Sequence, residues 1–185
     1  MVWAALIVIN IKMDKTKDPH QILQIWFSSS FPIGSYAYSH GVESLIDNKK
    51  IQNKSDVIEF LEAVLNYGTL RNDYIFIKSI YNNLEINDLI LSNATSKERQ
   101  IEMIAMGNSF RNIMRDSWDL NLQENSAFIY CVSKAAIYFN IDFNDLIKFY
   151  FQSFISNLIT VCVKHIPLSQ KDGQRINVMF INKIK

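Results

Sequence analysis

Apolar residues recur at helical spacing along most of this chain. The segment 124–139 has the clearest stripe, with apolar residues at i, i+1, i+4 and i+5: Ala127, Phe128, Cys131, Val132, Ala135, Ala136 and Phe139. This spacing places the apolar side chains on one face of an α-helix. Five glycines and three prolines are few for a β-rich chain, which needs frequent turns. The pattern therefore predicts an all-α fold.

Capping residues and breakers set the expected ends of the helices. Asp56 with Glu59, Thr95 with Glu98, and Asp142 with Asp145 each have the spacing of a helix start. Pro19 favours a first helical turn. We expect helices over 19–27, around 42–46, from 56 to the break at Gly68, over 74–81, over 88–92, from about 96 to 115, over 124–139, and from 142 to just before Pro167.

Three positions inside this pattern have special backbone requirements. Gly68, followed by the polar triplet 71–73, predicts a break or a kink. Gly107 lies inside a helical stripe, where glycine costs about 1 kcal/mol relative to alanine, so another element is expected to pack closely against it. Asn140 is suited to end the helix 124–139 in the left-handed conformation.

The helix that begins at Asp142 is apolar nearly all round. Its apolar residues are Leu146, Ile147, Phe149, Tyr150, Phe151, Phe154, Ile155, Leu158, Ile159, Val161 and Cys162. Such a helix is buried on most sides, so we expect a single-domain helical bundle with this C-terminal helix at its centre. Lys148, Gln152 and Lys164 argue against a membrane span.

The two ends of the chain differ from its centre. The apolar run Val2–Ile9 is too short to cross a bilayer, and no charged leading region precedes it. We expect residues 1–18 to be a flexible tail or a misassigned start, and residues 19–175 to form the domain. Residues 176–185 read as an atypical short C-terminus, such as a truncation or a frameshift would leave.

The composition of the chain limits the classes of function that it can have. A chain of 185 residues with 49% hydrophobic and 12% aromatic content suits one folded domain. The net charge of +1 gives no electrostatic case for binding nucleic acid or an anionic membrane. Cys131 and Cys162 both lie in apolar helical patterns, which indicates buried free thiols and a reducing cytoplasm.

The chain lacks the common motifs of catalysis. It contains no phosphate-binding G-x-x-x-x-G-K-[ST] loop, no G-x-G-x-x-G and no G-x-S-x-G. Its carboxylates are scattered and read as helix caps and solvated faces. His40 and Glu43 could share a metal on one helical face, but metal sites need three or four ligands, and His20 and His165 are distant in sequence. We therefore expect a binding protein without a metal site or cofactor.

The stretch 31–43, FPIGSYAYSHGVE, is the most distinctive in the chain. Pro32 ends the preceding helix, Gly34 permits backbone angles closed to other residues, and Ser35 can cap a new helix. Gly41 is read as lying inside that short helix, where a neighbour would pack closely. The stretch predicts a shaped corner between two helices.

This corner resembles the signature of the urease accessory protein family UreF, through Pro32, Gly34, Tyr36, Ser39, Gly41 and Glu43. Three further stretches are similar to family patterns in the same order. The first is Ala94–Gly107, with Thr95, Glu98, Arg99, Met106 and Gly107. The second is Ile137–Asp145, where Asn140 replaces the usual glycine. The third is Ser156–Arg175, with Asn157, Lys164, Pro167, Leu168, Gln170, Asp172, Gly173 and Gln174.

The resemblance implies an all-α, non-catalytic protein of urease maturation. Such a protein would form homodimers, bind a UreH/UreD-type scaffold and recruit the GTPase UreG, so that nickel reaches apo-urease with GTP hydrolysis. The UreG-facing surface is then expected at Tyr36, Tyr38, Ser39, His40 and Glu43. The competing interpretation is that Tyr36 and Gly41 only maintain the packing of the corner.

The dimer interface is expected on the helix that carries Lys148 and Gln152. Two alternatives stay open on the residues alone. One is a helical metal-binding enzyme that uses His40 and Glu43, and the other is a helical adaptor unrelated to urease.

Overall fold

The computed structural model describes residues 18–33 and 41–184. Within these residues the regular structure is entirely helical, which confirms the all-α prediction. The helices are α1 (Pro19–Trp26), α2 (Val42–Asp47), α3 (Lys54–Asn66), α4 (Thr69–Tyr81), α5 (Asn87–Ser92), α6 (Lys97–Trp118), α7 (Phe128–Tyr138), α8 (Phe143–His165) and α9 (Gln170–Ile181).

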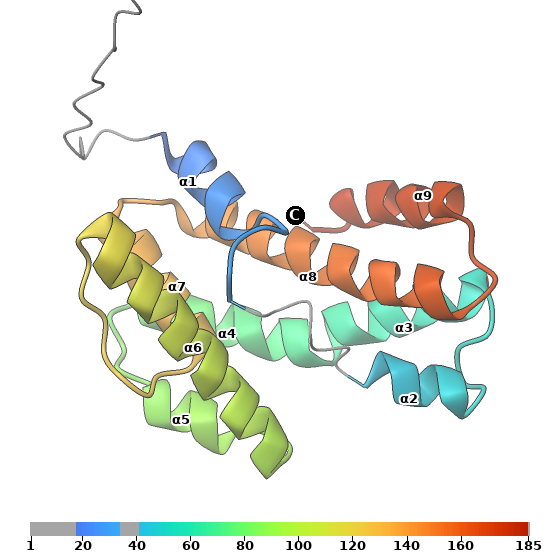
Figure 1. Cartoon of the computed structure of the whole chain (residues 1–185), viewed down its shortest axis with the longest axis horizontal. Helices are drawn as coiled ribbons and strands as arrows, with labels where there is room; N and C mark the ends of the chain where they lie inside the picture. The colour runs from blue at the N-terminus through green and yellow to red at the C-terminus, as the bar shows by residue number, and fades with distance from the viewer. Residues whose placement is uncertain (1–17, 34–40, 185) are drawn as a thin grey trace, which may run out of the picture.

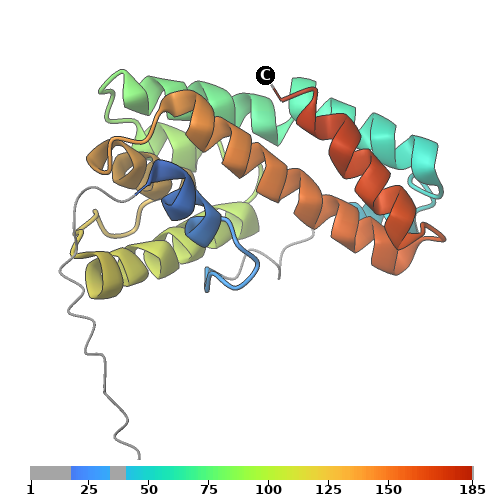
Figure 2. The ribbon, with the colours of Figure 1, turned by 90° about the horizontal axis from the view of Figure 1, so that it is seen from above.

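Helix α8 forms the centre of the bundle. It contacts α1, α2, α3, α4 and α9, and Figure 1 shows it running through the length of the molecule. Its buried side chains are Leu146, Ile147, Tyr150, Phe151, Ile155, Leu158, Ile159 and Cys162. Helices α1 and α9 both lie above α8 in Figure 1, and the view from above shows them over its two flanks (Figure 2). The predicted burial of this helix is therefore correct.

Helix α8 is also long and apolar enough to cross a membrane by length and composition alone. Half of its apolar window is buried inside the bundle. A core helix that other helices cover on several sides needs the same apolar composition as a membrane span. The position of α8 in the core therefore explains why its sequence is so apolar.

Several predicted helix starts are displaced by a few residues. Helix α3 is capped by Asn53, whose side chain accepts from the backbone N–H groups of Ser55 and Asp56, rather than by Asp56 itself. Helix α6 is capped by Ser96, whose hydroxyl accepts from the N–H of Arg99, rather than by Thr95. In each case an adjacent polar residue makes the same type of bond to the free N–H groups of the first turn.

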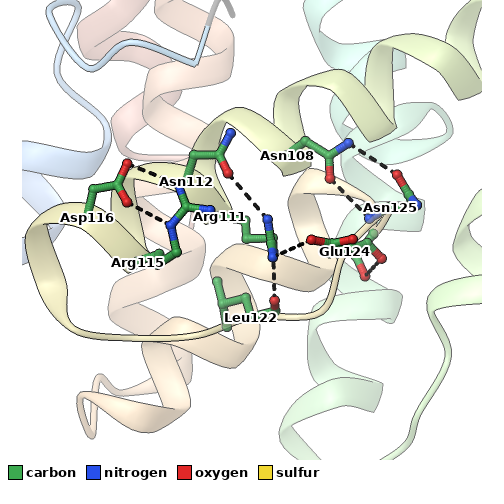
Figure 3. Close-up of polar contacts among 9 residues, drawn as sticks. Asn108, Arg111, Asn112, Arg115, Asp116, Leu122, Glu124 and Asn125 are labelled. Carbon is green, nitrogen blue, oxygen red and sulfur yellow. Dashed lines mark hydrogen bonds and ion pairs between the residues drawn. The ribbon is translucent and has the colours of Figure 1, made fainter.

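The predicted helix 124–139 begins four residues late, at Phe128. Side chains of α6 hold the residues before it in a loop, as Figure 3 shows. Arg111 donates to the carbonyl of Leu122 at 2.9 Å and to the carboxylate of Glu124 at 2.6 Å. Asn108 accepts from the backbone N–H of Asn125 at 3.0 Å. These tertiary bonds satisfy backbone groups that a longer helix would otherwise have used.

The ends of α7 and α8 agree with the prediction. Asn140 has a φ of 54°, in the left-handed region, directly after α7. Asp142 caps α8 by accepting from the N–H of Asn144 at 2.8 Å. Gly68 separates α3 from α4, as expected, but the polar triplet 71–73 lies inside α4 and does not interrupt it.

The interpretation of Gly41 was wrong. Gly41 precedes α2 instead of lying within it, and a Cβ added there would meet no atom of the described residues within 4 Å. Its φ of 82° lies in the left-handed region, which glycine adopts at little cost. The backbone conformation, and not a close neighbour, explains this glycine.

Helix α9 extends across residue 175, where we expected the domain to end. Ile176 and Phe180 are fully buried in the common core. Lys54 of α3 pairs with Asp172 at 3.1 Å, and Lys183 pairs with Glu62 of α3. A Cβ on Gly173 would approach the Val163 side chain of α8 to 2.9 Å. Residues 176–184 are therefore part of the packed bundle.

Both cysteines are free and buried, as predicted. Burial raises the pKa of the Cys131 thiol to about 12 and that of the Cys162 thiol to about 11. Both thiols therefore stay protonated at neutral pH. A protonated, buried thiol is neither a good nucleophile nor a good metal ligand.

Gly107 is the tightest helix-to-loop contact of the fold, as its position in the helical stripe predicted. A Cβ at this position would lie 1.9 Å from the backbone carbonyl oxygen of Ser126. We expect Gly107→Ala to lower the free energy of unfolding by about 3 kcal/mol, because backbone must move to admit the methyl group. Chemical denaturation measures the loss.

The matched control is Gly41→Ala. Among the described residues that methyl group meets no neighbour, so we expect the left-handed backbone strain of about 1–2 kcal/mol to set its cost. An equal or smaller loss for Gly107→Ala would contradict the close contact with the loop before α7.

Candidate functional site

The described part of the corner is anchored by two apolar residues. Phe31 and Ile33 are buried, while Pro32 between them is exposed. The Phe31 ring lies 5.8 Å from that of Phe110 on α6. The chain that follows α1 is therefore packed against the core through Phe31 and Ile33. Gly34, Tyr36, Tyr38, Ser39 and His40 lie outside the described residues, so their predicted roles stay predictions.

Beneath this anchor lies a partly open cavity of about 70 Å³. Residues of α1, α4, α6, α7 and α8 line it together with Ile33. The lining residues are Trp26, Phe27, Ser28, Ile33, Asp73, Arg99, Met103, Met106, Phe128, Ile129, Tyr150, Ser153, Phe154 and Asn157. Aromatic and other apolar side chains form most of the wall, with a few polar groups among them.

The cavity unites stretches that are far apart in sequence. Ile33 comes from the corner, Arg99 and Met106 come from the stretch 94–107, and Asn157 comes from the stretch 156–175. These are three of the four stretches singled out in the sequence. The fold brings them to one place because α6 and α8 both pass beneath the end of α1. We take this cavity, with Phe31 and Ile33 at its edge, as the candidate site.

Asp73 is the main polar group of the cavity, and the sequence reading missed it. Its side chain is buried, and its carboxylate accepts a 2.6 Å hydrogen bond from the Tyr150 hydroxyl. Burial raises the pKa of Asp73 from 3.8 to about 7, although the Tyr150 bond and the positive charge of Arg99 lower it. Burial and the charge of Asp73 raise the pKa of Tyr150 well above its ordinary value.

The signal for Asp73 was present in the chain. Leu70, Ile77 and Ile80 form the buried stripe of α4, and position 73 lies three residues after Leu70 and four before Ile77. An aspartate at a core position of an apolar stripe predicts a buried carboxylate. The expectations of a helix break at 71–73 and of a solvated carboxylate are both wrong for Asp73, which is buried inside α4.

Two further polar side chains contribute to the wall. Arg99 donates to Glu102 on the same helix, and both side chains are largely buried. The indole N–H of Trp26 is buried and has no hydrogen-bond acceptor among the described residues. Asp73, Arg99 and Met103 also line an outer cavity of about 80 Å³, together with residues of α5 such as Ile90. These three residues therefore lie between the two cavities.

The polar groups of the cavity connect three helices. Asp73 joins α4 to α8 through Tyr150, and its charge attracts Arg99 of α6. No group of three or more histidine, cysteine or acidic side chains in the described ranges is placed to hold a metal ion. Glu43, one member of the proposed metal pair, is exposed in the first turn of α2.

The remaining predicted residues lie elsewhere. Pro167 is exposed between buried Ile166 and Leu168, where the chain turns from α8 to α9, and Gln170 begins α9. Lys148 is exposed on α8. Gln152 is half-buried, and its amide donates to Ser156 at 3.2 Å and to Asn177 of α9 at 3.4 Å. Of the two residues expected at a dimer interface, only Lys148 faces outward.

The raised pKa of Asp73 predicts a pH-dependent stability. Between about pH 4 and pH 7 the folded chain holds a proton on Asp73 that the unfolded chain has lost. The free energy of unfolding should therefore decrease as pH rises through this window and level off above about pH 7. Asp73→Asn keeps an acceptor for Tyr150 without the charge, so it should raise stability above pH 7 by roughly 2–4 kcal/mol.

Urea denaturation from pH 4 to pH 8 tests this prediction. Asp47→Asn is the control, because Asp47 is an exposed carboxylate at the end of α2. That variant should keep the slope of the wild type. A slope that persists in Asp73→Asn would show that another group is responsible.

Comparison with known proteins matches this chain to one family. The UreF family model matches residues 51–179, which include α3 to α8 and most of α9. The urease accessory protein UreF of Ruegeria pomeroyi is 31% identical over 169 residues, covering 87% of this chain and 77% of the relative. The protein of the same name from Roseobacter denitrificans is 28% identical over 164 residues, covering 86% and 73%.

A third relative supports the same assignment. The urease accessory protein UreF of a Jannaschia species is 31% identical over 160 residues, covering 83% of this chain and 71% of the relative. The family consists of accessory proteins and not of enzymes, so the alternatives of a metal-binding enzyme and of an unrelated adaptor are wrong. The family model covers more than half of the chain and spans α6 and α8, which carry Arg99 and Asn157 into the cavity. This chain belongs to the UreF family of urease accessory proteins.

Proposed function

We propose that this protein is a cytoplasmic, non-catalytic scaffold that links a UreH/UreD-type partner to the GTPase UreG. In this role it brings the GTPase to apo-urease, where nickel is inserted with GTP hydrolysis. Membership of the UreF family supports a part in urease maturation. The named partners and the order of assembly are the proposal.

The main support for this proposal is that the stretches 31–43, 94–107 and 156–175 each contribute a residue to one cavity. Ile33, Arg99 and Asn157 line one cavity although they are far apart in the chain. A loop whose base is held by buried contacts loses little conformational entropy when a partner binds to it. Aromatic side chains on such a loop suit the centre of a protein interface. We therefore propose that Tyr36, Tyr38, Ser39, His40 and Glu43 face UreG.

Tyr36→Ala tests this assignment. The variant should reduce UreG capture at least tenfold, because truncation of a central aromatic residue commonly costs more than 1.4 kcal/mol of binding free energy. Capture is measured by pull-down with GTP-loaded UreG in the presence of the UreH/UreD-type partner. Circular dichroism and the unfolding midpoint report whether the variant keeps its fold.

Tyr67→Ala is the matched control. Tyr67 is 85% exposed after α3, outside the corner, so its removal should leave capture unchanged. Wild-type capture by Tyr36→Ala would refute the UreG-facing role. Loss of capture together with loss of the fold would favour the competing interpretation, in which the corner only packs.

We also propose that two copies of the chain associate through the α8 surface that carries Lys148. Lys148 is exposed, whereas the bonds from Gln152 to Ser156 and Asn177 hold Gln152 within its own chain. Lys148→Glu should halve the mass measured by light scattering, because reversing an interface charge disfavours association. Lys171→Glu, at an exposed lysine of α9, should keep the mass of the wild type. An unchanged mass for Lys148→Glu would exclude this surface.

A further inference from the structure

An apolar groove lies on α8 beside the last turn of α9. Its volume is about 350 Å³, and it is lined by Lys148, Phe149, Gln152, Ile181 and Ile184. Ile181 is 54% exposed, which is unusual for an isoleucine beside other apolar side chains. Figure 1 shows α1 and α9 above α8, and Figure 2 shows the end of α9 on the flank of α8 opposite α1.

The chain enters α1 at the edge of this groove. Nε2 of His20 lies 3.4 Å from a carboxylate oxygen of Asp145 on α8. The His20 ring lies 6.1 Å from the ring of Phe149, which lines the groove. Asp18 caps α1 by accepting from the N–H of His20 at 3.0 Å. These contacts place His20, and with it the start of α1, beside Phe149 at the wall of the groove.

The sequence before this point supplies an apolar segment of suitable length. Residues 2–9, VWAALIVI, carry no charged side chain, and residues 10–18 connect them to α1. Nine connecting residues can span up to about 30 Å. Burial of residues 2–9 would therefore desolvate no charge, and the connection is long enough for them to return to α8.

We propose that residues 2–9 of this chain bind in the groove between α8 and α9. The segment would cover Phe149, Ile181 and Ile184, while the charged end of Lys148 stays at the margin. A tethered segment of the same chain is present at an effective concentration near the millimolar range, so a modest intrinsic affinity is enough for occupancy. This proposal does not depend on the proposed function.

The size of the groove favours a short segment over a second copy of the chain. A stable interface between two proteins covers about 800 Å² on each partner and some 20–30 residues. Within the part of the chain that the structure describes, five residues line this groove. A run of eight apolar residues matches a site of that size without further contacts. A docked segment also leaves Lys148 available to the dimer contact proposed above.

A disulfide between Leu6→Cys and Ile181→Cys tests the proposal in the full chain. Both native cysteines are buried and do not compete. Mild oxidation should join the two new thiols within one chain, which shows as a faster non-reducing band and as a linked peptide in mass spectrometry. The control pairs Leu6→Cys with Ile101→Cys, because Ile101 is 58% exposed near the start of α6, which lies away from α9 (Figure 1).

Linkage at least tenfold more efficient at position 181 than at position 101 would support the proposal. Equal linkage at both positions, or none at 181, would overturn it. A disulfide between two chains at position 181 would assign the groove to a second copy and would also overturn it.

Hydrogen exchange gives a second, independent measurement. Amides of residues 2–9 should exchange more slowly than those of residues 12–17 in the wild-type protein. Ile181→Glu places a charge in the groove at an exposed position, so it should remove that protection while the amides of α8 stay protected. Fast exchange of residues 2–9 in the wild type would refute docking.

Discussion

The need to cover α8 on nearly every side is the constraint on which this fold depends. Its apolar residues do not form a single stripe, so one partner helix cannot bury them. Helices α1, α2, α3, α4 and α9 surround it from separate parts of the chain. Each burial of a leucine, isoleucine or phenylalanine on α8 contributes roughly 1.5–3 kcal/mol. The order of the helices in space follows from this requirement.

That central position also explains where the candidate site lies. Helix α8 passes beneath the end of α1 and beside α6, so it brings Asn157 to the same cavity as Ile33 and Arg99. A buried carboxylate, Asp73, adds a polar contact to Tyr150 inside this apolar region. Burying such a group costs free energy unless it is bonded, and the bond requires one arrangement of α4 against α8. The polar contact therefore specifies how the helices meet beneath the corner.

Loops at the periphery are held by a different type of interaction. Asn108 and Arg111 of α6 bond the residues before α7, and Gly107 allows that loop to touch the helix backbone (Figure 3). Helix α9 is fixed in part by ion pairs to α3 from Asp172 and Lys183. Partly exposed pairs of this kind add little stability, so the burial of Ile176 and Phe180 remains the main reason that α9 packs.

The sequence by itself determined the helical class, the burial of α8, the close contact at Gly107 and the left-handed end at Asn140. These features depend on periodicity and on local backbone preferences, which short segments carry within them. Only the tertiary structure decided that Asp73 is buried, that Gly41 precedes its helix, and that residues 119–127 form a loop. For Asp73 and for the loop, side chains distant in sequence supply the deciding hydrogen bonds, and no local sequence pattern contains the distances between such side chains.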